Sequence, residues 1–241
     1  MTATRKRGLA RGHSPEGLGH DAHEQIRDLI VAMKLSPGAP LSESELTMKL
    51  GASRTPIRQA LQQLEQEGFV VAHRHGAVTR LSVAPMTVED MKELHAIFGA
   101  LQGLAARSAT QLPDPARLEL ANRLEGFNNA LRTAWKARPD RVREAQDLHV
   151  AFHRAIDEAV TGRRLSAELR AIQPQVERYE RVYTSALLTD FSDALKEHED
   201  MIKAIRKGDA DAAERATVEN WRRGSERYER VVQDLGERGS W

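Results

Sequence analysis

Hydrophobic positions recur at helical spacing along most of this chain. Ile26, Ile30 and Met33 fall on one side of a helix that the pattern predicts over residues 20–33. The proline and glycine residues that follow Lys34 end this helix. The chain is therefore expected to begin its ordered part with an amphipathic helix that has a clear stop.

Two shorter helices follow, separated by a tight turn. Ser42 and Glu45 have the spacing of a capping box, in which each side chain satisfies a backbone N–H of the other. Gly51 ends the helix that starts there. The next helix starts at Ser53 or Thr55, where a hydroxyl can accept from an unpaired backbone N–H. Two short helices with a glycine-containing turn predict a helix-turn-helix.

The second of these helices has two different faces. Ile57, Leu61 and Leu64 form an apolar stripe. The polar side chains off that stripe are Arg54, Thr55, Arg58 and Gln62. Guanidinium groups bind guanine edges or phosphates, and hydroxyl and amide groups do either more weakly. Taken alone, such a face is more often an ordinary solvated surface. The neighbouring segments therefore decide between a solvated surface and a DNA-binding one.

A β-rich pattern follows the helix-turn-helix. Residues 69–72 and 77–81 are rich in strand-forming types, and they flank a short basic segment that ends in His75 and Gly76. We expect a hairpin, and a helix-turn-helix followed by a small basic hairpin is a winged helix. The glycine allows the backbone of the tip to approach a DNA minor groove, and the alternative is an exposed hairpin without a ligand.

The rest of the chain has a helical pattern after a linker at residues 85–87. One side of the helix over residues 87–111 carries the apolar residues Met91, Leu94, Phe98, Leu101 and Leu104. Five further helices are expected, over residues 114–137, 139–161, 163–187, 190–207 and 209–236. Pro174 is expected to kink or interrupt the helix over residues 163–187, and Asp209 is expected to cap the last helix.

These elements predict a mainly α protein. A flexible basic tail over residues 1–18 is followed by a winged helix-turn-helix over residues 19–83. Residues 84–241 form the second domain, in which six helices on about 155 residues predict an all-α bundle.

Composition excludes several classes of protein. The chain has no cysteine, which excludes disulfides and thiolate metal sites. No apolar run is long enough to cross a membrane, and no hydrophobic segment follows the N-terminal basic residues as in a secretory signal. We therefore expect a cytoplasmic protein. Residues 1–85 hold 11 Lys and Arg against 8 Asp and Glu, which gives weak support for nucleic-acid binding.

The N-terminal motifs resemble those of the GntR family of bacterial transcription regulators, in the FadR-like branch that carries an FCD ligand domain. The resemblance extends from about residue 20 to residue 235, and it is most specific in three runs: residues 35–46, 50–61 and 64–68. It implies a homodimer on a short palindromic operator, with recognition helices in the major groove and wing tips in the minor groove. The matching DNA-contact positions are Ser53, Arg54, Thr55, Arg58, His75 and Gly76. Ser44 stands where many relatives have arginine, so that one contact is expected to be weaker or absent.

Three histidines in the second domain form a possible metal site. His149 and His153 are four residues apart on a predicted helix, which places both imidazoles on one face. His198 lies on another predicted helix. On spacing alone, a shared metal ion and ordinary hydrogen-bonded core histidines explain the pattern equally well.

The resemblance to FCD domains sharpens this hypothesis. Metal-binding relatives carry Asp-x-x-x-His on one helix, a histidine on a later helix and another on the last. His153 and His198 match two of these positions, whereas His149 replaces the aspartate and Asn220 replaces the last histidine. We expect a divalent metal, zinc or nickel, because imidazoles suit these ions and the set has no carboxylate. The alternative is that metal has been lost and the polar cluster binds an effector directly.

The effector is expected to be a small molecule, a carboxylate with an apolar or aromatic part. Relatives often have arginine four residues before a glutamate on the first FCD helix, where this chain has Phe98 and Gln102. The arginine clamp on an organic acid is missing there, and Phe98 offers an aromatic wall instead. Tyr179, Tyr183 and Trp221 are further candidates to line the cavity, although core packing explains each of them as well.

The sequence favours a ligand-responsive repressor or activator, in which the effector prefers one arrangement of the dimer over another. The rival is a metal-dependent hydrolase or lyase built on His149, His153 and His198, which requires a general base near an open metal position. Glu197 and Glu199 flank His198, but adjacent residues on a helix do not share a face. No nucleophile motif, phosphate loop or nucleotide fingerprint supports the enzyme.

Overall fold

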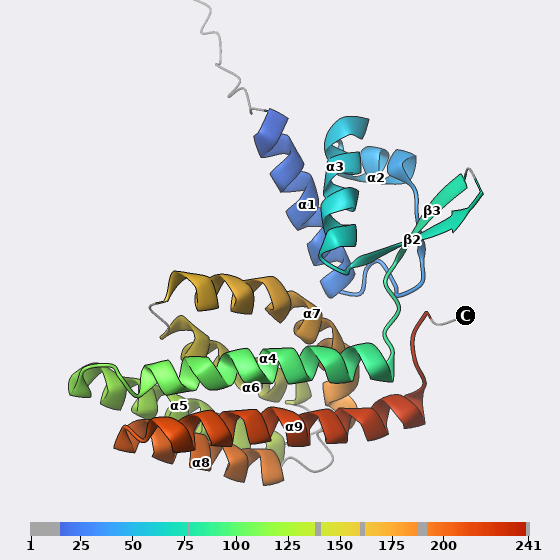
Figure 1. The fold of residues 1–241 in the computed structure, drawn as a ribbon. Coiled ribbons are helices and arrows are strands. Elements are labelled where there is room, and N and C mark those ends of the chain that lie inside the picture. Colours follow the sequence, from blue (N-terminus) through green and yellow to red (C-terminus); the bar gives the residue numbers. More distant parts are fainter. Residues whose placement is uncertain (1–14, 77, 138–140, 160–161, 188–191, 240–241) are drawn as a thin grey trace, which may run out of the picture. The chain divides into compact units, whose positions relative to one another are not determined.

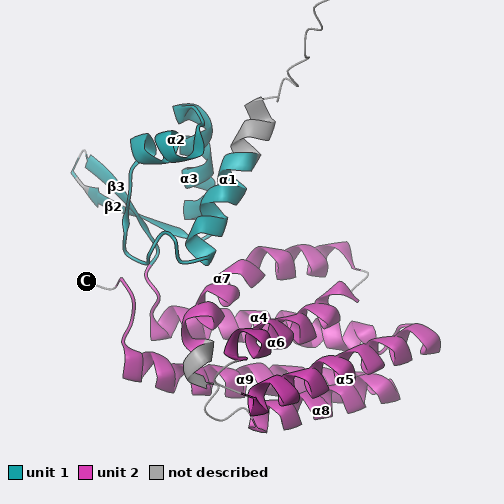
Figure 2. Cartoon of the chain, turned by 180° about the vertical axis from the view of Figure 1, so that it is seen from behind, with its two compact units in different colours: residues 1–84 teal, residues 85–241 magenta. Residues whose placement is uncertain are grey.

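The computed structural model describes residues 15–76, 78–137, 141–159, 162–187 and 192–239. The chain divides into two compact units, Met1–Ala84 and Pro85–Trp241 (Figure 2). Most of the expected basic tail, residues 1–14, lies outside the described residues. The first helix begins at Pro15 and takes in the rest of that tail. No helix in the described part of the chain is long and apolar enough to cross a membrane.

In its described residues, unit 1 combines three helices with a three-stranded antiparallel sheet in the order β1-β3-β2. Figure 1 shows the three helices and the hairpin of β2 and β3. The elements are α1 (Pro15–Val31), β1 (Pro40–Leu41), α2 (Glu43–Leu50), α3 (Arg54–Gln66), β2 (Val70–His75) and β3 (Val78–Val83). Its core joins the apolar stripes of α1 and α3, and the fully buried members include Ile26, Ile30, Ile57 and Leu64. The helix-turn-helix is thus held by α1 on one side and by the sheet at its end.

The predicted boundaries of α2 are confirmed. The Ser42 hydroxyl accepts from the backbone N–H of Glu45, and Gly51 ends the helix in the left-handed conformation with φ 65°. The expectation of a hydroxyl cap on α3 is wrong. Ser53 occupies the N-cap position, but its side chain makes no capping hydrogen bond, and Thr55 already lies inside the helix.

The wing is longer than the sequence predicted. His73 and Arg74 were expected in the turn, yet they pair with Arg80 and Thr79 as part of the β-ladder. The turn itself holds Gly76, whose φ of 62° favours glycine. The short strand β1 was not predicted either, because a two-residue strand is too short to show an alternating pattern.

In its described residues, unit 2 consists of six helices (Figure 1). They are α4 (Val88–Ala109), α5 (Asp114–Lys136), α6 (Val142–Glu158), α7 (Arg163–Leu187), α8 (Ser192–Lys207) and α9 (Ala210–Leu235). The long helices α4 and α9 run side by side, and two glycines of α4 permit their close approach. A Cβ atom on Gly99 would lie 2.7 Å from Cβ of Trp221, and one on Gly103 would lie 2.7 Å from Cγ2 of Val218.

Two details of the predicted bundle are wrong, and one is confirmed. Of the two effects expected of Pro174, a kink or an interruption, the interruption is wrong: α7 continues through the proline as a single element, with Leu169 and Val176 buried on both sides of it. Leu104 is 45% exposed, since the buried stripe of α4 passes through Gln102 instead. Asp209 caps α9 as predicted, with its carboxylate accepting from the backbone N–H of Ala212.

The tight α4–α9 contact gives a first prediction. We expect Gly99→Ala to lower the free energy of unfolding of unit 2 by about 1–3 kcal/mol, because the new methyl group overlaps Trp221. Gly126→Ala in α5 is the matched control, since a Cβ there has no neighbour within 4 Å. That control is expected to gain about 0.5–1 kcal/mol from the loss of glycine flexibility. Urea unfolding followed by tryptophan fluorescence measures both, because all three tryptophans belong to unit 2. Equal effects of the two substitutions would contradict the packing.

Candidate metal centre and nucleic-acid interface

The structure brings the three predicted histidines together. His149 and His153 come from neighbouring turns of α6, and His198 comes from α8. One ring nitrogen of each lies within 4.8 Å of the ligand nitrogens of the other two. His153 and His198 are 5% and 0% exposed. Three imidazoles this close can share a divalent ion after small side-chain rotations.

The proton position on His153 follows from its neighbours. The indole Nε1–H of Trp221, which can only donate, lies 2.6 Å from Oε1 of Gln102. The amide nitrogen of Gln102 donates to Asp157 Oδ1 at 3.0 Å, which agrees with this orientation. His153 Nδ1 lies 2.7 Å from the same Oε1, so Nδ1 carries the proton and donates. In the neutral ring, the lone pair is therefore on Nε2.

His198 is fixed in the same way by a different amide. Asn128 Nδ2 donates to the backbone carbonyl of Leu195 at 3.1 Å, so Asn128 Oδ1 is an acceptor. It accepts from Nδ1–H of His198 at 3.0 Å. The Nε2 atom of His198 is buried and has no hydrogen-bond partner among the described residues. Metal-binding histidines characteristically donate their other N–H to an oxygen in this manner.

Burial keeps all three imidazoles neutral. It lowers the pKa of His149 to about 4, with a further contribution from the Arg227 charge. Burial also lowers the pKa of His153 and of His198 well below the ordinary value, and His149 adds to both effects. Neutral imidazoles need not lose a proton to bind a metal ion near pH 7. The residues present therefore fit a divalent metal.

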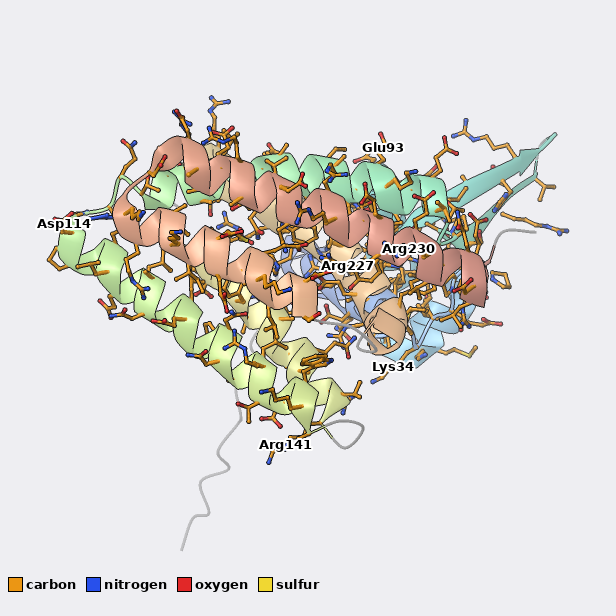
Figure 3. All side chains as sticks on the ribbon, turned by 90° about the horizontal axis from the view of Figure 1, so that it is seen from below. Lys34, Glu93, Asp114, Arg141, Arg227 and Arg230 are labelled. Carbon is orange, nitrogen blue, oxygen red and sulfur yellow. The ribbon has the colours of Figure 1, made fainter. Side chains whose placement is uncertain are left out.

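Asn220 lies at the edge of the same site. Its Nδ2 atom donates to Glu197 Oε2 at 2.9 Å, because a carboxylate can only accept. Glu197 is held in turn by a bidentate pair with Arg227 at 2.9 and 2.8 Å. Arg227 is one of the α9 side chains labelled in Figure 3. The amide oxygen of Asn220 remains as its acceptor atom toward a metal ion or a water molecule.

A cavity of about 30 Å³ adjoins the histidines. Its lining comprises His95, His149, His153, Glu180, Ala194, Asn220, Trp221, Gly224, Arg227 and Tyr228. A volume of this size holds about two water molecules. It therefore suits a metal ion with a very small ligand, and a larger ligand requires side chains to move.

The predicted effector residues separate into two groups. Phe98 and Trp221 pack edge to face, with ring centroids 4.9 Å apart, and Gln102 is buried against His153. These three residues join the histidine cluster. Tyr183 does not, because its hydroxyl donates to the Gly236 carbonyl at 3.2 Å. Tyr179 also points elsewhere, and its hydroxyl donates to Asp90 Oδ2 at 2.6 Å.

Sequence reasoning missed three residues of this cavity. Glu180 is buried, and its Oε1 lies 3.9 Å from Nε2 of His149, so a carboxylate lies beside the three histidines. Nothing in the charged sequence of α7 distinguishes Glu180 from its neighbours. Arg227 was equally hidden in the charged sequence of α9. His95 was detectable, because it lies four residues after Met91 on the apolar face of α4.

The base that a hydrolase or lyase would need is not supplied by the residues beside His198. Glu197 is held by Asn220 and Arg227, and Glu199 pairs with Arg132 at 2.6 Å. Both carboxylates are therefore engaged away from the three histidines. This agrees with the expectation that neighbours on a helix face different ways.

The predicted nucleic-acid residues of unit 1 lie on its exposed surface. Ser44 on α2 is exposed, as are Ser53, Arg54 and Thr55 at the start of α3. Arg58 is also exposed, but its guanidinium makes two hydrogen bonds to the Glu43 carboxylate, at 3.1 and 3.2 Å. This contact lowers the pKa of Glu43.

The predicted wing residues lie at the end of the hairpin. Gly76 is exposed in the turn, and His75 ends strand β2. The side chain of His75 is outside the described residues.

Comparisons with known proteins all find bacterial transcription regulators. Residues 18–79 match the model of the family described as bacterial regulatory proteins, gntR family, and residues 93–223 match the FCD domain. The chain is 28% identical over 195 residues to an HTH-type transcriptional regulator of Mycobacterium tuberculosis, covering 80% of this chain and 73% of the relative. It is 29% identical over 202 residues to the probable D-xylose utilization operon transcriptional repressor of Paenarthrobacter nicotinovorans, covering 80% and 82%.

Solved structures share the fold. Escherichia coli McbR/YncC is similar with a TM-score of 0.64 at 16% identity, over 91% of this chain and 99% of that protein. A transcriptional regulator of Pseudomonas syringae described as a GntR family member is similar with a TM-score of 0.51 at 22% identity. That likeness covers 92% of this chain and 89% of the other.

The buried ring of His95 gives a prediction about acid stability. Both of its nitrogens lack hydrogen-bond partners among the described residues, and burial lowers its pKa to about 3. Between pH 6.5 and 3, the unfolded chain binds a proton at this residue that the folded protein does not. The free energy of unfolding of the wild type therefore decreases as the pH is lowered through this range. His95→Phe removes this loss. We expect its stability advantage over the wild type to grow by about 2 kcal/mol between pH 7.5 and 5.

Urea unfolding of the metal-free protein at the two pH values measures this difference through tryptophan fluorescence. Gly126→Ala, which changes no titratable group of unit 2, is the control, and its difference from the wild type is expected to stay constant with pH. A gap between His95→Phe and wild type that stays constant with pH would show that His95 is not held neutral.

Proposed function

We propose a function on the premise that this chain belongs to the GntR family of bacterial regulatory proteins and carries an FCD domain. It is a transcription regulator, and its relatives are regulators and not enzymes, which overturns the hydrolase or lyase alternative. We infer that it binds a palindromic DNA operator as a homodimer, under control of a small effector and a divalent metal. One observation carries the metal proposal. Gln102 and Asn128 accept from Nδ1–H of His153 and His198, so the Nε2 lone pairs of both rings are free to bind a metal ion.

The proposed DNA contacts begin at the first turn of α3. Arg54 and Thr55 are exposed there, where the recognition helix of a helix-turn-helix meets base edges in the major groove. The Glu43 pair holds the Arg58 guanidinium beside them in the free protein, and on DNA this group exchanges Glu43 for a phosphate or a base. His75 and Gly76 place the wing tip at the minor groove.

The proposed metal is zinc or nickel, held by His149, His153 and His198. The amide oxygen of Asn220 is available as a further ligand or as a contact to bound water, since its nitrogen is committed to Glu197. When bound, the ion supplies a positively charged position that a carboxylate can occupy. The protein contributes buried imidazoles whose ring orientations are fixed by hydrogen bonds.

The proposed effector is a small carboxylate. Arg227 at the cavity wall adds positive charge, and the aromatic surfaces of Phe98 and Trp221 suit an apolar part. Because the cavity has only about 30 Å³, an effector with an aromatic part has to displace one of these side chains. The Paenarthrobacter relative is described as a repressor, which supports repression as the sign of control.

The helix α7 offers a route from the cavity toward the DNA-binding unit. Glu180 lines the cavity, and the preceding residue, Tyr179, binds the first turn of α4. The Tyr179 hydroxyl donates to Asp90 and accepts from the Thr87 N–H at 3.1 Å. The helix α4 begins a few residues after the boundary at Ala84. An effector that moves α7 therefore acts on the segment that follows unit 1.

The metal proposal predicts the zinc content of the purified protein. After dialysis against zinc and removal of free ion, elemental analysis is expected to give about one ion per chain. His153→Ala and His198→Ala are expected to lose it, because each removes a ligand with a fixed lone pair. His73→Ala, in unit 1, serves as the control and is expected to retain zinc. A zinc-free wild type would leave only direct effector binding by the polar cluster.

The DNA proposal predicts a selective loss of operator affinity. The probe is double-stranded DNA recovered with the wild-type protein by binding-site selection from a random library. Arg54→Ala is expected to cost about 1–3 kcal/mol, which weakens binding about 5- to 150-fold. Arg123→Ala on α5, which removes an exposed pair with Glu158 and a contact with the Phe127 ring, both in unit 2, is the control. If Arg54→Ala and Arg58→Ala both bind DNA as tightly as the wild type, α3 is wrongly assigned as the recognition helix.

A further inference from the structure

Glu180 has an unusual position for a glutamate. It is 6% exposed, and it lines the cavity together with His149 and His153. Its Oε1 atom lies 3.9 Å from Nε2 of His149. It comes from α7, whereas the four positions of the expected metal pattern lie on α6, α8 and α9.

The charge of Glu180 is poorly compensated by the protein. Within the described part of the chain, no lysine or arginine nitrogen lies within ion-pair distance of its carboxylate. Arg154 on α6 is paired with Glu177 at 2.9 Å. A buried carboxylate in this setting is costly unless a cation reaches it.

Glu197 provides the internal comparison. It is buried to the same degree, at 7% exposed, but it has a bidentate arginine partner in Arg227. The two buried glutamates on either side of the cluster thus differ in whether the protein supplies their counter-charge. A cation that compensates Glu180 would lie beside its carboxylate, next to the imidazole of His149.

We propose that Glu180 is a ligand of the metal ion, and that it supplies from α7 the carboxylate that the replacement of aspartate by His149 removed from α6. The inference rests on the proposed metal centre. Two ligand atoms on one tetrahedral zinc ion lie about 3.4 Å apart, so the Glu180–His149 pair closes to that distance by a small side-chain rotation. The ligand set is then three imidazoles and one carboxylate, with Asn220 as a contact to bound water.

Charge removal at Glu180 tests the assignment in the full-length protein. Glu180→Gln keeps the size of the side chain and removes its charge, and Glu168→Gln removes an exposed carboxylate of the same helix. Zinc affinity is measured by competition with a chelator, and the visible spectrum of the Co²⁺-loaded protein reports its ligands. We expect Glu180→Gln to bind zinc at least about tenfold more weakly, with a changed Co²⁺ spectrum. Glu168→Gln is expected to bind zinc as the wild type does.

The outcomes separate this inference from the proposed metal centre. If the wild type binds no zinc, the metal centre itself fails. If the wild type binds zinc, and Glu180→Gln matches it in affinity and Co²⁺ spectrum, the metal centre stands and the role of Glu180 is overturned. Weaker zinc binding with an unchanged spectrum also overturns it, because Glu180 then acts only through His149.

Stability measurements guard against a folding defect. Removing a poorly compensated buried charge is not expected to destabilise the metal-free protein, so Glu180→Gln should unfold at the same or a higher urea concentration than the wild type. If it does not fold, Glu180→Asp decides the question. It keeps the charge but withdraws the carboxylate by one methylene, so zinc affinity equal to the wild type would overturn the assignment.

Discussion

The hydrogen bonds that Gln102 Oε1 accepts are the constraint on which the histidine cluster of unit 2 depends. One comes from Trp221, which can only donate, and this fixes the amide orientation. The other comes from His153 Nδ1, and it leaves the Nε2 lone pair facing the cluster. Without this amide, the indole and the imidazole would be buried without a shared acceptor, at a cost of about 1–3 kcal/mol for each unpaired group.

The bundle is built so that this contact can form. Gly99 on α4 lets α9 approach until Trp221 reaches Gln102, three residues farther along α4. Asn128 repeats the arrangement between α5 and α8 for His198. Five helices, α4, α5, α6, α8 and α9, therefore determine the positions of two imidazole lone pairs. The helix α7 brings Glu180 to the same cavity and Tyr179 to the start of α4. A movement of α7 at the cluster would therefore also move the start of α4, which follows the linker.

The sequence predicted the class of fold and the histidines, but not the atoms that orient them. Capping by Ser42, the glycine stop at Gly51 and the spacing of His149 and His153 are local signals, so they could be read directly. Glu180 and Asn128 could not be identified, because their roles depend on which helices pack together. Leu104 was misplaced for the same reason: its spacing fits an apolar stripe, while the packing of α9 buries Gln102 instead.

The claim that fixed Nε2 lone pairs make this cluster a metal centre is tested most directly by anomalous diffraction from zinc-loaded crystals of the full-length protein. The expected map has a zinc peak bonded to Nε2 of His153 and His198. Their Nδ1 atoms should remain hydrogen-bonded to Gln102 and Asn128. A zinc ion bound through Nδ1 of either histidine, or no peak among the three imidazoles, would contradict the claim.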